Sequence, residues 1–154
     1  MTEKSVIRDR LWHSVEMNHY KANLIIYTIF IPLLLVYAAL RINSEYAWEI
    51  GFVIVAVVMV PVYIFHGWRI FQIFRAPEEY IFCPCKLSQF HYDYLHKASS
   101  FTVVLDVPEM GRQVVETRAI FQSHGLVGPL AEDYVNRTVT IGYNRATQTV
   151  VVIG

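Results

Sequence analysis

Two uncharged apolar runs constrain this chain more than any other feature of its sequence. Residues 22–40 read ANLIIYTIFIPLLLVYAAL, and residues 50–68 read IGFVIVAVVMVPVYIFHGW. A helix of that length spans about 28 Å, close to the hydrocarbon thickness of a bilayer. Because the link of residues 41–49 is short, the two helices must run antiparallel. We therefore predict a transmembrane hairpin with a juxtamembrane extension over residues 22–75, preceded by an N-terminal cytoplasmic or interfacial helix over residues 1–21.

Basic residues gather at one end of this predicted hairpin. Those before the first run and after the second are Lys4, Arg8, Arg10, Lys21, Arg69, Arg75 and Lys86. The link between the runs contains only Arg41. Since segments rich in Lys and Arg stay in the cytoplasm, we expect a multi-pass protein of the cell membrane with both termini cytoplasmic.

The sequence changes character after residue 75. Residues 101–107 alternate between apolar and polar side chains, and similar short segments at 80–86, 90–95, 113–121, 137–143 and 148–153 predict further strands. Pro108 and Gly111 predict a type I turn, and Pro129 predicts a short helix. Residues 150–153 are apolar on both faces, which favours a central or barrel-closing strand. The prediction for residues 76–154 is a small antiparallel β-barrel-like or curled-sheet domain, which makes the whole chain an α+β membrane protein.

Charge argues against a nucleic-acid partner. The chain has 13 Lys and Arg against 13 Asp and Glu, so its formal net charge is zero. Residues 76–154 contain six basic and eight acidic side chains, a net charge of −2 that opposes binding to a phosphate backbone. The expected partners are the lipid bilayer and either another protein or a second copy of this chain.

The C-terminal half resembles a known kind of protein. A membrane helix pair, the strand pair FTVVLDVPEMGRQVVETRAIF and the closing segment VNRTVTIGYNRATQTVVVIG resemble a broad family of uncharacterised bacterial membrane proteins with a small β domain after transmembrane helices. Val139, Ile141, Tyr143 and Asn144 match the family's last hairpin, whereas residues 145–147 lack its usual proline. The resemblance implies a bacterial inner-membrane setting and a small β fold. It implies no activity, because none is established for the family.

Four residues form the sharpest candidate site: Cys83, Cys85, His91 and His96. Two thiolates and two imidazoles are a ligand set that tetrahedral zinc accepts, although zinc sites usually place two to four residues between their cysteines. The alternatives are a thiol-redox pair, or two apolar cysteines that pack beside surface histidines. No nucleophile motif or phosphate-binding loop accompanies these residues, so we expect no enzyme.

These observations favour a membrane-anchored, non-enzymatic accessory or interaction protein. A toxin-immunity role and an adaptor role are both compatible with the sequence. The alternative of a different class is a metal-binding or thiol-redox protein that uses Cys83 and Cys85 with His91 and His96.

Overall fold

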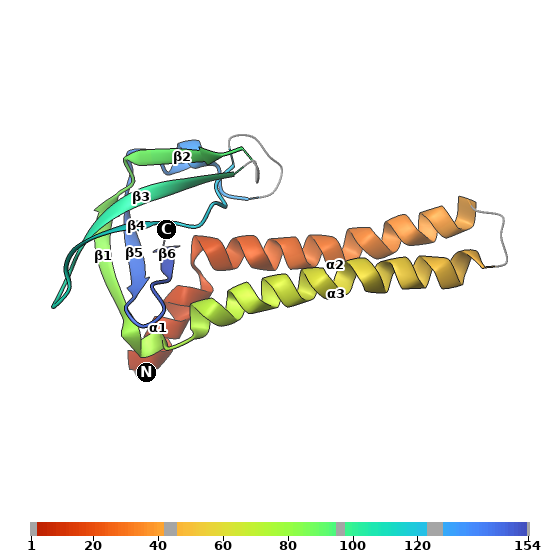
Figure 1. The fold of residues 1–154 in the computed structure, drawn as a ribbon, viewed down its shortest axis with the longest axis horizontal. Coiled ribbons are helices and arrows are strands. Elements are labelled where there is room, and N and C mark those ends of the chain that lie inside the picture. The colour runs from red at the N-terminus through yellow and green to blue at the C-terminus, as the bar shows by residue number, and fades with distance from the viewer. Residues whose placement is uncertain (1–2, 42–45, 95–97, 123–127, 154) are drawn as a thin grey trace. The chain divides into compact units, whose positions relative to one another are not determined.

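The computed structural model describes residues 3–41, 46–94, 98–122 and 128–153 (Figure 1). The described residues form three helices, six strands and two short 3₁₀ helices. The elements in order are α1 (Glu3–Trp12), α2 (Val15–Arg41), α3 (Ala47–Phe74), η1 (Pro77–Glu79), β1 (Tyr80–Lys86), β2 (Gln89–Asp93), β3 (Ala98–Val107), β4 (Gly111–Glu116), η2 (Ala131–Asp133), β5 (Thr138–Asn144) and β6 (Val150–Ile153). This order confirms the predicted α+β layout of two long apolar helices followed by small antiparallel sheets.

The chain divides into two compact units. Met1–His19 and Phe71–Gly154 form one unit, here called the β unit, and Tyr20–Ile70 form the other, called the helix pair. The N-terminal residues up to His19 therefore belong to the same compact unit as the strands. Both long helices begin or end inside the β unit and continue into the helix pair.

The two long helices have the length and composition of membrane spans. Val15–Arg41 and Trp48–Phe74 each contain 27 residues, and their most apolar windows have mean hydropathies of 2.2 and 2.3. Only 6% and 11% of those windows are buried, unlike an enclosed core helix of a soluble protein. Figure 1 shows α2 and α3 running side by side in opposite directions, as the short link predicts.

Polar groups of the two helices meet inside the helix pair. The hydroxyls of Thr28 on α2 and Tyr63 on α3 share a hydrogen bond. The imidazole of His66 lies 5.8 Å from the ring of Tyr20 and 5.9 Å from that of Tyr27, centre to centre. Such contacts hold two apolar helices together where the hydrophobic effect between them is weak, as it is in lipid.

The N-terminal helical stretch is interrupted at Ser14. The hydroxyl of Ser14 donates to the carbonyl of Leu11 at 2.7 Å and accepts from the N–H of Met17 at 3.3 Å. Serine is a preferred N-cap because its side chain satisfies an N–H group of the first turn. Ser14 and Leu11 are both fully buried, so α1 and the first turn of α2 pack within the β unit.

The six strands form two separate antiparallel sheets, with strand orders β1-β5-β6 and β2-β3-β4. Every strand predicted from the sequence is present, with ends shifted by a few residues. The two sheets do not join into a closed barrel in the part of the chain that the structure describes. Their inner faces instead meet through side chains, and that contact buries apolar surface without a continuous ladder of hydrogen bonds.

One core fills the space between the sheets. Phe101 on β3 and Phe121 are fully buried, with ring centres 4.9 Å apart in an edge-to-face arrangement. Around them pack Val15, Leu87, Val103, Leu105, Val107, Ile120, Ala131, Ile141, Tyr143, Val150 and Val152. The contribution of Val15 shows that the start of α2 belongs to this core.

The last strand, β6, lies at the edge of its sheet, so the prediction of a central or barrel-closing strand for residues 150–153 is wrong. In the described part of the chain β6 pairs with β5 alone. The N–H of Val152 donates instead to the carboxylate of Glu16 at 2.8 Å. A helix can cover a strand edge as effectively as another strand can. This cover explains why Val150, Val151 and Val152 are all buried.

The turn between β3 and β4 also differs from its prediction. The N–H of Met110 donates to the carbonyl of Val107 at 3.2 Å, so Pro108 and Glu109 are the central residues. Glu109 has a φ of 70°, which a type II turn requires at this position and a type I turn forbids. The turn is therefore type II, with a glutamate where glycine is usual.

Candidate functional site

The two cysteines of the predicted zinc site lie on β1 and face the core. Cys83 and Cys85 are partly buried against the core cluster, and neither forms a disulfide. The Sγ of Cys83 lies 3.9 Å from the carbonyl oxygen of Ile141, and that of Cys85 lies 3.7 Å from the carbonyl oxygen of Val104. Pro84 between them is tolerated because β1 is an edge strand.

The histidines are not gathered around these thiols in the described residues. His91 is exposed on β2 in the other sheet, and its Nε2 lies 3.0 Å from the hydroxyl oxygen of Thr102. His96 lies outside the described residues. Within the described ranges, no group of three His, Cys, Asp or Glu side chains is arranged to hold a metal ion. The zinc site therefore stays a prediction.

The environment of Cys85 favours the neutral thiol. Burial, and after it the neighbouring Cys83, raises the pKa of Cys85 to about 11. Metal ligation and thiol exchange both use the thiolate, so an elevated pKa works against either chemistry. The arrangement matches two apolar cysteines that pack against a core.

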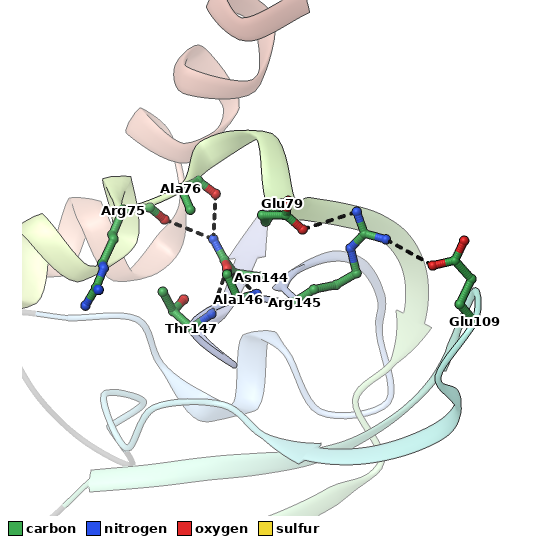
Figure 2. A network of polar contacts seen from close by, with 8 residues as sticks. All are labelled: Arg75, Ala76, Glu79, Glu109, Asn144, Arg145, Ala146 and Thr147. Atoms are coloured by element: carbon green, nitrogen blue, oxygen red, sulfur yellow. Dashed lines mark hydrogen bonds and ion pairs between the residues drawn. The ribbon is translucent and has the colours of Figure 1, made fainter.

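A polar network around Asn144 organises the junction between α3 and the strands. Asn144 is fully buried at the end of β5. Its Nδ2 donates to the carbonyls of Arg75 at 3.0 Å and Ala76 at 2.9 Å, and its Oδ1 accepts from the backbone N–H groups of Ala146 and Thr147 (Figure 2). Ala76 has a φ of 51°, in the left-handed region. One side chain therefore holds both the chain reversal after α3 and the turn before β6.

Arg145 extends the same network toward two acidic residues. Its Nη2 lies 3.2 Å from a carboxylate oxygen of Glu79, and its Nη1 lies 3.8 Å from one of Glu109 (Figure 2). Its backbone N–H also donates to the carbonyl of Glu79 at 3.1 Å. These pairs tie the last hairpin to η1 and to the β3–β4 turn, which is a structural role.

Glu16 is the most unusual ionisable group of the β unit. It lies six residues before the first apolar run and is fully buried. Burial raises its pKa from 4.5 to about 7, against the lowering effect of the Val152 and Glu16 N–H groups and of the positive charge of Arg118. Sequence reasoning missed this residue, since an acid in a first helical turn is ordinary.

The role of Asn144 in the polar network was equally hard to predict from the sequence. The sequence marks it as a turn former, and its Oδ1 does cap that turn. Its Nδ2 donates to the carbonyls of Arg75 and Ala76, which precede Asn144 by 69 and 68 positions in the chain. No local sequence pattern indicates these contacts.

The fold and these contacts define an α+β chain with two apolar helices and a small two-sheet β unit. Comparison with protein-family models, with curated proteins and with solved structures finds no match. The resemblance to bacterial membrane proteins with a small β domain therefore stays a prediction.

Proposed function

We propose that this chain is a two-span membrane protein, without enzymatic activity, that presents its β unit in the cytoplasm to a protein partner. The observation that carries the proposal is the exposure of apolar side chains along both long helices. Phe52 is 75% exposed and Leu40 is 73% exposed. A lipid bilayer is the solvent in which such surfaces are stable without further cover.

A binding role for the β unit draws support from its outer surface. Val104 on β3 and Val114 on β4 are opposite each other in the sheet and are both exposed. On the opposite face of the same sheet, Phe90 and Tyr92 are exposed at the β2 edge, and the exposed Tyr94 follows them. Exposed apolar and aromatic groups on one sheet are typical of surfaces that bind proteins. A toxin-immunity role and an adaptor role in an envelope or secretion complex both fit this surface.

The partner is tested by affinity purification of the full chain in mild detergent. The variant Val104→Lys with Val114→Lys should keep the fold, because both side chains point away from the core, and should lose the partner. A matched Gln148→Lys change, at an exposed position of the last hairpin, should retain it. A wild-type chain that purifies as a monomer with no associated protein would contradict the binding role.

Orientation is tested separately, with single cysteines in a Cys83→Ser, Cys85→Ser background. A membrane-impermeant maleimide should label Ser44→Cys in intact cells, and it should label Gln148→Cys only after the membrane is opened. The reverse pattern would place both termini outside the cytoplasm.

Metal analysis of the untagged protein, before and after both cysteines are replaced, decides the zinc alternative.

A further inference from the structure

A polar cavity lies within the β unit beside the end of α3. Its volume is about 590 Å³, and residues of α3, of the β4 end and of the last hairpin line it. That volume is within the usual range for small-ligand pockets. The side chains that matter most are those of Gln72, Arg75, Glu116, Arg118, Thr147 and Thr149.

Two arginines dominate the charge of this cavity. Arg118 donates from Nη2 to the amide oxygen of Gln72 at 3.0 Å, and its positive charge also acts on the buried carboxyl of Glu16. Arg75 is exposed, and no carboxylate of the described residues lies within salt-bridge distance of its guanidinium. The one acidic side chain in the lining, Glu116, is engaged by the hydroxyl of Ser100. The lining therefore contains two arginines against one glutamate, whereas residues 76–154 as a whole have a net charge of −2.

Hydrogen bonds connect the backbone segments around the cavity. Asn144 holds the backbones of Arg75, Ala76 and Thr147 together, and Figure 2 shows the Arg75 side chain extending away from that network. The hydroxyl of Thr147 donates to that of Thr149 at 2.9 Å, which leaves the Thr149 O–H group as a donor. Arginines and hydroxyl donors are the groups that bind phosphate oxygens.

We propose that this cavity binds a negatively charged phosphate group, carried either by an anionic phospholipid headgroup or by a soluble phosphate ester. The lipid source rests on the proposed membrane anchorage. Arg75 directly follows the end of α3 and lies seven residues after Trp68, the last residue of the second apolar run. Arginines that follow an apolar run so closely extend their side chains toward phospholipid headgroups.

The test uses the full chain, purified in neutral detergent and freed of lipid. Native mass spectrometry measures binding of phosphatidylglycerol, of zwitterionic phosphatidylcholine and of glycerol 1-phosphate. Preference for phosphatidylglycerol without glycerol phosphate binding assigns the site to a lipid headgroup. Binding of glycerol 1-phosphate assigns it to soluble esters. Equal binding of the two lipids without glycerol phosphate binding, or no binding at all, overturns the proposal.

Variants show whether the cavity itself is responsible. Arg75→Gln removes an exposed charge and Ala146→Glu adds an opposing one at an exposed lining position, so neither change disturbs the core. Each should weaken binding about tenfold, as the loss of a charged hydrogen-bond partner does. Arg112→Gln, an exposed arginine outside the cavity lining, is the matched control. Unchanged binding by both cavity variants, with unchanged melting temperatures, would overturn the proposal.

If the proposed membrane anchorage is wrong, the experiment gives a different result from the one expected if phosphate binding is wrong. A chain recovered in the soluble fraction without detergent would contradict the proposed membrane protein. The glycerol 1-phosphate titration would still decide whether the cavity binds phosphate.

Discussion

The β unit and the helix pair are both rich in apolar side chains, and they place them in opposite ways. In the β unit Phe101 and Phe121 are 0% exposed and meet edge to face in a shared core. In the helix pair Phe52 is 75% exposed and belongs to a surface of similar residues. The first arrangement is that of a domain folded in water. The second arrangement is stable only if the surrounding solvent is apolar. This requirement is the basis of the proposed membrane anchorage.

The largest expected effect comes from removing the same aromatic ring in the two units. Phe101→Ala should destabilise the β unit by about 4 kcal/mol, because it removes buried surface and leaves a cavity. Phe52→Ala should change the melting temperature little, since that ring packs on few protein atoms. Thermal unfolding of both variants in detergent, followed by circular dichroism, measures the difference. Equal losses would mean that the helix pair buries Phe52 against something else.

A lysine placed at an exposed valine in each unit sharpens the comparison further. Val57 near the middle of the second apolar run and Val114 on β4 are 65% and 68% exposed. In a bilayer, Val57→Lys should cost about 3 kcal/mol of insertion free energy, whereas Val114→Lys in water should be tolerated. The measurement is the fraction of each variant that resists carbonate extraction from membranes. If the two variants behave alike, the helix pair is not surrounded by lipid.

The buried carboxyl of Glu16 makes the stability of the β unit depend on pH. Its pKa is raised from 4.5 to about 7 on folding, so between those values the folded state binds more protons than the unfolded state. Stability should therefore fall as pH rises from 4.5 to 7, by about 3 kcal/mol at about 1.4 kcal/mol per pH unit. Glu16→Gln, which still accepts the Val152 N–H, should remove most of that slope.

Thermal melts of wild-type and Glu16→Gln protein at several pH values between 4.5 and 8 provide the check. The groups whose charges are coupled to Glu16 are Arg118, Tyr80 and Tyr134. The exposed Glu132→Gln variant serves as a control and should keep the wild-type slope. A wild-type stability that rises with pH over this range would contradict the assignment.

The smallest expected effect concerns the turn after β3. Glu109 occupies the left-handed region at a φ of 70°, where glycine carries no steric penalty. Its ion pair with Arg145 is 3.8 Å long, and the Glu109 side chain is 86% exposed, so little is lost with it. Glu109→Gly should stabilise the β unit by about 0.5 kcal/mol, whereas Glu109→Val should destabilise it. Chemical denaturation of the three proteins measures both changes.

Local patterns predicted most of the elements correctly. The apolar runs fall inside α2 and α3, and alternating β-branched residues locate β1, β3 and β5 to within a few residues. Those signals depend on neighbours in the chain, so a sequence displays them directly. The break at Ser14 was predictable in principle, because serine followed by an acid in the next turn is a helix start.

Local sequence patterns predicted much less of the candidate site, because many of its contacts join segments that are distant from one another in the chain. The cysteines do share one face of β1, as their spacing indicates, but His91 belongs to the other sheet. The carboxylate of Glu16 accepts a hydrogen bond from the N–H of Val152, which is 136 residues away in the chain. The arginines of the cavity come from positions 75 and 118, and only folding brings them together.

The sequence by itself determined the two apolar helices, the strand content of residues 76–154 and the absence of any excess charge that would attract nucleic acid. These properties follow from composition and periodicity, which act locally. Tertiary structure alone decided that the strands form two sheets instead of one barrel, that β6 is an edge strand covered by Glu16, and that Asn144 joins α3 to the last hairpin. The physical reason is that burial and hydrogen bonding are satisfied between distant segments, and several different partners can satisfy the same strand edge or polar group.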